Sequence, residues 1–533
     1  MPKVVIPLVS EYNTRGLFAT ADKDARLING LYVPVVNQAS RSAAWYVEKR
    51  PGWITHQSTG TSLSGLAVLN SDTQQVVSAY RGGNVVSAIF EGSTNCGSIS
   101  GESTVVNSFV WGSLAYVMIG NDASGSAPYS GWYLGENASA ATTFQGTITS
   151  GQKTISGVSS TTGIYVGQLL TQTALTAGTR IASISGTDVI TDTNAISTTA
   201  AATITRQAVS KILDADFPAT PPYIYCELDG YVFVSDTANR RIYNSDLNAV
   251  HSWGASNYIT VDSAVGELLS VARYKNYIVA LCTRGIQFFY NAGNTSGSPL
   301  SRVPQGTITG IGTSGTNFFV PAWDNLYWFF STPNTTTGAG IYCLDGLTPK
   351  KISTPTIDNL FTANPTYLGK MTIGGRRYIY IFGTPTFLYD VGAEKWQEVS
   401  FSSTYVIDDY YGVNATAGRG IIYRMDNTSY QDASTTYTLT VQTPRMNFGT
   451  NNRKRIKKVS LIADNQASGS AYLSWSTDDY ATFGTARTLD MTANEKSARN
   501  LGAARNWAFR VIHYDNTAFR AEGLEVEYDE LDN

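Results

Sequence analysis

Residues 223–244, which read YIYCELDGYVFVSDTANRRIYN, decide the fold. Two apolar runs, Tyr223 to Cys226 and Tyr231 to Val234, flank the turn residues Asp229 and Gly230. β-Branched and aromatic side chains suit a pleated, half-buried strand, whereas Asp and Gly suit a tight turn. The stretch therefore predicts an antiparallel hairpin, followed by a third strand from Arg241 to Asn244.

Similar units follow at a spacing of roughly 40 to 50 residues up to Arg424. They occupy residues 268–290, 309–343 and 377–399, and strand-like runs also occur at 75–80, 85–90 and 115–120. A sheet of three or four strands cannot cover both of its faces, so neighbouring sheets in a ring bury one another. We predict an all-β fold built on a β-propeller of five or six blades, although an array of β-sandwiches would give the same spacing.

Two regions break this pattern. From about Phe144 to Arg206 the aromatic residues nearly vanish, while Ile and Val alternate with Thr and Ser. This alternation predicts a small inserted β-domain, and disorder is the alternative. After about Thr440 new strand patterns predict a C-terminal β-sandwich. The expected division is an N-terminal platform segment (1–60), two propeller parts (61–143 and 207–440), the insert (144–206) and the sandwich, or platform (441–533).

Composition limits the partners of the chain. Only 15% of the 533 residues are charged, against a usual value of about 25%, and the formal net charge is -3. No overall attraction to nucleic acid or to anionic membranes follows. No apolar run approaches the roughly 18 residues of a membrane span, and the N-terminus lacks the pattern of a signal peptide, so we expect synthesis in a cytoplasm.

The sequence contains no recognisable catalytic or metal-binding motif. There is no G-x-S-x-G, P-loop or H-E-x-x-H, and no C-x-x-C links the four cysteines, Cys96, Cys226, Cys282 and Cys343. The three histidines, His56, His251 and His513, stand apart. We expect ordinary thiols, no cofactor, no metal site and no enzymatic activity.

Two local patterns could be mistaken for parts of an enzyme. The acid pairs Asp214/Asp216 and Asp408/Asp409 could serve a glycosidase, but adjacent acids are commonly turn residues. Residues 476–483 resemble the Asp-box of sialidases, S-x-D-x-G-x-T-W, with a tyrosine in place of the glycine. In that motif Asp and Ser cap a turn, so the stretch predicts a hairpin.

Two further patterns could bind partners. A carbohydrate-binding propeller would stack sugars on surface tryptophans such as Trp132, Trp253 or Trp396, although such residues more often belong to the blade core. Five cations lie within six residues and form a possible docking patch: Arg453, Lys454, Arg455, Lys457 and Lys458. They could contact an acidic protein surface or phosphates, or they could be a solvated loop that enters a strand.

Several stretches resemble the tail accessory, or packaged-DNA stabilisation, proteins of short-tailed bacteriophages. The resemblance rests on the order of Asp229–Tyr231, Asp246-Leu247, Leu268–Val271, Ile278–Leu281, Gly285–Tyr290 and Arg302–Gly312. It continues in Lys49–Trp53 near the start and in Leu473–Asp479 and Ala498–Arg505 near the end. The insert departs from the pattern and looks like the Thr/Gly-rich modules of phage fibres.

This resemblance implies a non-enzymatic tail nozzle or hub. Six copies would form a ring below the head–tail adaptor, with the platform at the adaptor, and would extend the DNA-exit channel and retain packaged DNA until ejection. The implied partners are other copies of the chain, the adaptor, tail fibres or tailspikes, and passing double-stranded DNA. The implied location is the virion, after assembly in the bacterial cytoplasm and without a membrane span. A carbohydrate-binding propeller and, more weakly, a propeller glycosidase remain alternatives.

Overall fold

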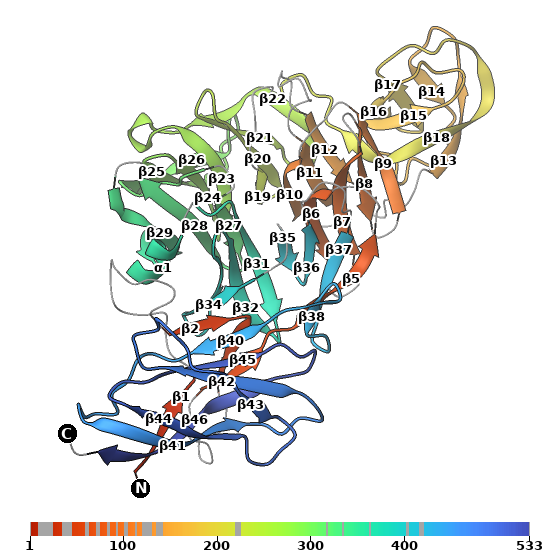
Figure 1. Ribbon diagram of the computed structural model, residues 1–533. Helices are drawn as coiled ribbons and strands as arrows, with labels where there is room; N and C mark the ends of the chain where they lie inside the picture. The colour runs from red at the N-terminus through yellow and green to blue at the C-terminus, as the bar shows by residue number, and fades with distance from the viewer. Residues whose placement is uncertain are drawn as a thin grey trace.

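The computed structural model shows a nearly all-β chain in three parts: a propeller, a small inserted domain and a platform (Figure 1). It describes the following residues: 2–8, 25–34, 45–58, 63–70, 75–82, 86–91, 94–100, 105–111, 114–119, 130–134, 142–218, 225–315, 318–332, 335–361, 364–400, 405–414 and 421–531. Within these residues the only α-helix is α1 (Pro355–Leu360), capped by Thr354.

The first four blades each contain four antiparallel strands. Blade 1 comprises β6 (Leu63–Asn70), β7 (Gln75–Gly82), β8 (Val86–Glu91) and β9 (Thr94–Ser100). Blade 2 comprises β10 (Val105–Trp111), β11 (Leu114–Ile119), β12 (Ser130–Leu134) and the end of β18 (Thr199–Lys211). Blade 3 comprises β19 (Tyr225–Leu228), β20 (Tyr231–Asp236), β21 (Arg241–Asp246) and β22 (Ala249–Thr260). Blade 4 comprises β23 (Leu268–Tyr274), β24 (Tyr277–Cys282), β25 (Gly285–Asn291) and β26 (Leu300–Thr309).

The remaining blades complete the ring. Blade 5 comprises β27 (Phe319–Ala322), β28 (Asn325–Thr332), β29 (Thr335–Asp345) and β30 (Thr348–Lys351). Blade 6 comprises β31 (Tyr367–Ile373), β32 (Arg376–Phe382), β33 (Thr386–Asp390) and β34 (Lys395–Val399). Blade 7 comprises β35 (Tyr405–Asp409), β36 (Tyr411–Asn414), β37 (Ile421–Asp426) and, from the N-terminal region, β5 (Gly52–Ser58). The first strand of blade 7, β35, lies beside β6 of blade 1, so the ring closes.

The structure confirms the all-β class and the propeller, and it corrects the number of blades. The described strands form seven blades, whereas five or six were expected. The difference arises because blade 1 and three strands of blade 2 come from residues before the insert, and because β5 supplies the outer strand of the last blade. A regular spacing of strands along the sequence does not reveal a strand that lies far in sequence from its partners.

Neighbouring blades bury each other's apolar faces. Phe288 of blade 4 and Trp328 of blade 5 lie in one fully buried cluster, and Phe233 of blade 3 shares another with Phe289 of blade 4. A fully buried aromatic side chain contributes about 2–3 kcal/mol through its removal from water. The ring therefore owes its stability to contacts between blades, as the pattern of apolar strands predicts.

The inserted domain forms part of the same sheet as blade 2. Its strands are β13 (Thr142–Ile148), β14 (Thr154–Ser156), β15 (Gln168–Thr171), β16 (Ile181–Ser185), β17 (Asp188–Thr191) and the first part of β18. The 13-residue strand β18 pairs with β13 in the insert and with β12 in the blade. The guanidinium of Arg180 also lies 4.9 Å from the ring centroid of Trp132, which joins the insert to the blade.

Gly167 allows β15 of the insert to approach β18. A Cβ atom at this position would lie 1.8 Å from the carbonyl oxygen of Lys211, and the residue has a φ of +88°. We expect Gly167→Ala to displace β15, so that amides of β15 and β18 exchange with deuterium at least about tenfold faster. Gly178→Ala is the matched control, because its φ is +91° and no atom lies within 4 Å. Equal exchange in the two variants would show that the close approach is unimportant.

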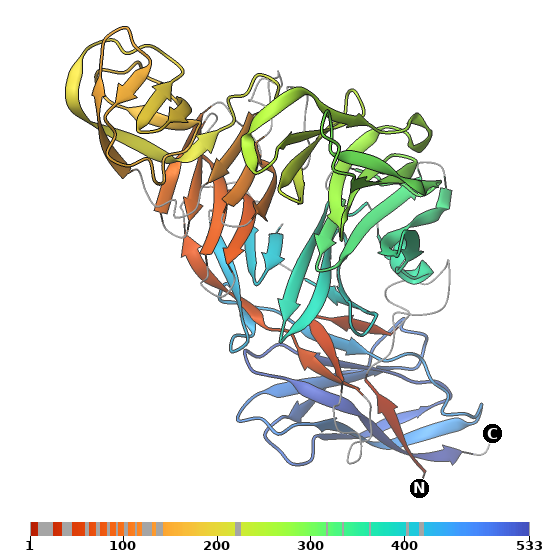
Figure 2. The same cartoon turned by 180° about the vertical axis from the view of Figure 1, so that it is seen from behind.

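The platform is a β-sandwich made from both ends of the chain, as expected (Figure 2). One sheet comprises β1 (Lys3–Pro7), β3 (Gly30–Pro34), β4 (Trp45–Lys49), β41 (Arg453–Ala463), β44 (Ser497–Ala504) and β46 (Arg520–Leu531). The other comprises β2 (Arg26–Ile28), β40 (Leu439–Gln442), β42 (Ser470–Ser476), β43 (Arg487–Asp490) and β45 (Ala508–His513). Trp507, Phe509 and Leu524 are fully buried in the core between the sheets. The second sheet meets blade 6 through one parallel pair, Ile28 with Glu398.

Candidate functional site

The expected docking patch lies on strand β41 of the platform, where strand alternation divides it. Arg453 and Arg455 are exposed, whereas Lys454 is buried. The Nζ atom of Lys454 donates to the carbonyl oxygens of Thr450 and Arg505, and burial lowers the pKa of this amine. The five cations therefore do not form one continuous surface.

Acidic residues of β46 and of a nearby turn accompany the remaining cations. Lys457 Nζ lies 2.6 Å from a carboxylate oxygen of Asp529, and Lys458 Nζ lies 2.6 Å from one of Glu495. These are partly exposed ion pairs, each of which contributes between 0 and about 1 kcal/mol to stability. They neutralise two of the five cations, and Arg453 and Arg455 are the most exposed members of the patch. A docking role for the patch stays a prediction.

Among the sequence patterns that suggested an enzyme, Asp214 and Asp478 make hydrogen bonds that cap turns. Asp214 accepts hydrogen bonds from the backbone N–H groups of Asp216 and Trp253, both at 2.9 Å, and thus caps a turn. The side chain of Asp408 lies outside the described residues. Asp478 of the Asp-box-like stretch accepts from the Ser476 hydroxyl at 2.8 Å and from Thr482 N at 3.0 Å, which confirms the predicted turn. The Thr482 hydroxyl also donates to Asp478, and this bond, together with those from Thr482 N and Ser476, lowers the pKa of Asp478 to about 2.

The tryptophans considered for sugar stacking and the described cysteines are buried. Trp132, Trp253 and Trp396 are each at most 6% exposed, so they belong to the core and present no platform for a sugar. Three described cysteines are free, buried thiols: Cys226, Cys282 and Cys343. Cys96 lies outside the residues whose side chains are described. In the described part of the chain, no group of three or more His, Cys, Asp or Glu residues could hold a metal ion.

Among the described residues, a dense polar site lies where the chain passes between platform and propeller. The first crossing, residues 49–52, connects β4 with β5. The second, residues 427–438, connects β37 with β40 through β38 (Gln431–Asp432) and β39 (Thr435–Thr436). The two crossings lie side by side, because Asp432 pairs with Trp53 and Gly52 N donates to Ser429 O at 2.7 Å. We call this pair of crossings the neck.

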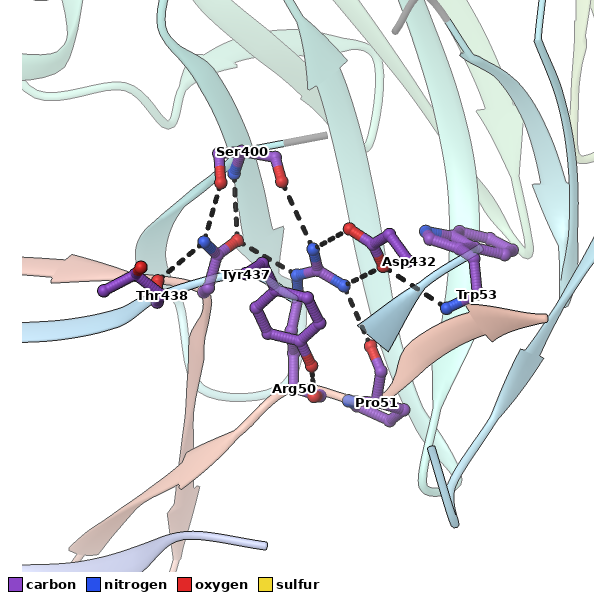
Figure 3. A network of polar contacts seen from close by, with 8 residues as sticks. Arg50, Pro51, Trp53, Ser400, Asp432, Tyr437 and Thr438 are labelled. Atoms are coloured by element: carbon purple, nitrogen blue, oxygen red, sulfur yellow. Dashed lines mark hydrogen bonds and ion pairs between the residues drawn. The ribbon is translucent and has the colours of Figure 1, made fainter. Parts of the chain in front are cut away.

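Arg50 occupies the centre of the neck and is wholly buried (Figure 3). Its guanidinium donates to both carboxylate oxygens of Asp432, at 2.9 and 2.5 Å. The other donors reach the carbonyl oxygens of Pro51 at 2.9 Å and Ser400 at 3.2 Å, and Oδ1 of Asn29 at 3.0 Å. These five bonds use all five N–H groups of the guanidinium, so the buried charge is fully paired.

The ring of Tyr437 covers one face of this guanidinium. Its ring centroid lies 3.7 Å from Cζ of Arg50, and its hydroxyl donates to the carbonyl oxygen of Arg50. Burial raises the pKa of Tyr437, so the hydroxyl stays a neutral donor. The Nζ atom of Lys49 lies 4.7 Å from the same centroid and donates to Asp515 O at 2.7 Å, while burial lowers the pKa of Lys49 to about 8.

The network around Arg50 connects three parts of the structure. Asn29 belongs to the turn between β2 and β3 of the platform, and its amide donates to Ser400 Oγ at 2.7 Å and to Thr438 O at 2.9 Å. Ser400 follows β34 of blade 6. Asp432 also accepts from the backbone N–H of Trp53, at 3.3 Å, where β5 begins to complete blade 7. The arrangement therefore fixes the platform against two blades.

A second ionic contact crosses the same junction outside the neck. Arg26 of β2 donates to both carboxylate oxygens of Glu398 in β34, at 2.8 and 2.7 Å. Its side chain is 23% exposed, in contrast to that of Arg50 at 0%. Leu31 of β3 adds an apolar contact, because it packs in one cluster with Trp53 and blade 6.

Sequence reasoning did not find this site. The stretch Lys49–Trp53 was noted only for its resemblance to a family motif, and Asp432 lies 382 positions after Arg50. No local pattern links residues so far apart. An arginine directly before Pro51-Gly52 was the one available signal.

Closed blades and a sandwich platform made from both chain ends define a β-propeller protein. Residues 158–400 match the family described as "Phage_stabilise: Bacteriophage P22 Gp10, beta-propeller". The match confirms the resemblance to phage tail stabilisation proteins and supports a structural role in a phage tail and a place in the virion. No curated protein matches this sequence.

Solved structures show only distant similarity. "YCF48 bound to D1 peptide" is 11% identical with a TM-score of 0.34, and covers 70% of this chain and 97% of that one. The N-terminal domain of Nup159 is 8% identical with a TM-score of 0.33, over 75% and 98%. The phage phi92 endosialidase is 11% identical with a TM-score of 0.28, over 88% and 70%. These low scores carry no functional argument. Among the described residues, no helix has the length and apolar character needed to cross a membrane.

Proposed function

We propose that this chain is a tail nozzle or hub protein that assembles in the host cytoplasm as a ring, a hexamer, below the head–tail adaptor. The ring extends the DNA-exit channel and retains packaged DNA until ejection. The observation that carries this proposal is the match of residues 158–400 to the phage stabilisation family. The partners are other copies of the chain, the adaptor, and fibres or tailspikes, and the chain acts without catalysis.

The charge of the chain supports a channel through which DNA moves. A protein that neutralises many phosphates binds DNA tightly and in a salt-dependent manner. Here a formal net charge of -3 is spread over 533 residues, and two of the five cations in the main basic cluster are paired with acids. Weak binding of DNA phosphates suits a protein that lines a channel through which DNA must move.

Native mass spectrometry tests the assembly directly. We expect the purified chain to form a ring, alone or after addition of adaptor rings, with a mass of six copies. Images of the complex are expected to show the channel of the adaptor continued through the new ring. A chain that stays monomeric even with adaptor rings present would overturn the proposal.

The platform patch offers a sharper test of adaptor binding. We propose that Arg453 and Arg455, the exposed members, contact an acidic surface of the adaptor. The double variant Arg453→Glu/Arg455→Glu is expected to weaken adaptor binding at least about tenfold, in line with the cost of placing like charges across an interface. Lys153→Glu is the control, because Lys153 is an exposed cation of the insert, outside the platform. Equal binding by both variants would remove the patch from the interface.

A further inference from the structure

The neck lies between a strand that completes the propeller ring and a strand that belongs to the platform sheet. β5 follows the first crossing directly and supplies the outer strand of blade 7. β4 precedes the same crossing and pairs with β46 of the platform. One short segment, residues 49–52, therefore lies between two strands that each complete a different part of the fold.

The carboxylate of Asp432 accepts hydrogen bonds from Arg50 within this segment and from Trp53 directly after it. It accepts two bonds from Arg50 and a third from the backbone N–H at the start of β5. On the platform side, Arg50 binds Asn29, and the hydroxyl of Tyr437 binds the carbonyl oxygen of Arg50. Neither β5 nor the turn at Asn29 can move away without breaking bonds to one buried ion pair.

We propose that the Arg50–Asp432 pair is a clasp that couples local opening of the propeller to local opening of the platform. If one partner is removed, the other becomes a buried charge or acceptor without compensation. Water must then enter the neck, and both β5 and the platform strands lose protection together. The coupling is a property of the single chain and does not depend on the proposed ring.

The Arg26–Glu398 contact provides a matched control. It is also a bidentate pair of arginine and carboxylate between platform and propeller. It joins β2 to β34 and is more exposed than the Arg50–Asp432 pair. Asp432→Asn and Glu398→Gln are equivalent changes, since each replaces a carboxylate by its amide. Asp432→Asn weakens the clasp, whereas Glu398→Gln weakens the Arg26–Glu398 contact.

Hydrogen–deuterium exchange of the full-length chain, followed by mass spectrometry, tests the proposal. In Asp432→Asn we expect exchange to rise at least about tenfold in both β5 of the propeller and β45 of the platform. In Glu398→Gln we expect a rise confined to β2 and β34. A rise on only one side of the neck in Asp432→Asn, or the same pattern in both variants, would overturn the clasp.

A milder variant keeps the test decisive if Asp432→Asn does not fold. Tyr437→Phe retains the ring over the guanidinium and removes only the hydroxyl that donates to Arg50 O. It is expected to give the same two-sided rise in exchange with a smaller amplitude. Exchange that rises on one side only, or that stays at the wild-type level in both β5 and β45, would contradict the coupling.

Discussion

The variant Gly52→Ala is expected to fold poorly and to accumulate in insoluble form. A Cβ atom on Gly52 would lie 2.0 Å from the carbonyl oxygen of Gln431, in the facing crossing of the neck. The backbone cannot yield there, because Gly52 N is bonded to Ser429 O and Asp432 to Arg50. We expect a loss of about 3 kcal/mol or more in the free energy of unfolding, measured by urea denaturation of any soluble fraction.

A second glycine provides the control for this substitution. Gly392 lies in the turn after β33, and the nearest atom to an added Cβ would be Asp390 Oδ1, at an ordinary contact distance of 3.6 Å. Gly392→Ala is expected to change the free energy of unfolding by less than about 1 kcal/mol. If Gly52→Ala were as stable as Gly392→Ala, the neck would be far looser than the structure shows.

Acidification from pH 6.5 to pH 4 is expected to cost the folded chain about 3 kcal/mol through His513 alone. The ring of His513 is fully buried against Phe519. Burial, and to a smaller extent the charge of Lys49, lower the pKa of this imidazole from 6.5 to about 4. Below pH 6.5 the unfolded chain takes up a proton at His513 while the folded chain stays neutral there, so stability falls as the pH falls. The loss ends below about pH 4, where the folded chain is protonated as well.

Urea denaturation at several pH values measures the effect of His513. Because many carboxylates also titrate below pH 5, the useful quantity is the difference between wild type and His513→Gln. The variant is expected to lose most of the slope between pH 6.5 and pH 4, whereas the same change at the half-buried His56, whose pKa burial also lowers, is expected to remove less of it. A wild-type slope in His513→Gln would mean that the pKa of His513 is not lowered in the folded chain.

Local patterns predicted the blades because each blade is made mainly from neighbouring strands. The opening stretch, 223–244, predicted two strands and a turn that the structure shows as β19, β20 and the turn at Asp229 and Gly230. Alternation of apolar residues specifies such hairpins directly. The seventh blade could not be predicted in the same way, since β5 pairs with β37 about 370 positions later. Pairing at that distance leaves no periodic signal.

The basic cluster shows a second limit of local reading. Five cations in six residues suggest one charged surface, but a strand turns alternate side chains to opposite faces. Lys454 is therefore buried while Arg453 and Arg455 are exposed. The partner of Lys457, Asp529, comes from β46, and no property of residues 453–458 indicates it. The charges of a segment can be read from its sequence, whereas the acidic partners that neutralise them come from strands that only the fold brings near.

The 13-residue strand β18 restricts how the insert can be exchanged during evolution. A domain carried on a loop can be removed without damage to its host. Here removal of residues 142–211 would also take the outer strand of blade 2, because Lys211 pairs with Trp132. A recombination that swaps the insert and preserves the propeller must join within β18, between Arg206 and Val209. Any replacement module must therefore end in a strand long enough to be shared with its host.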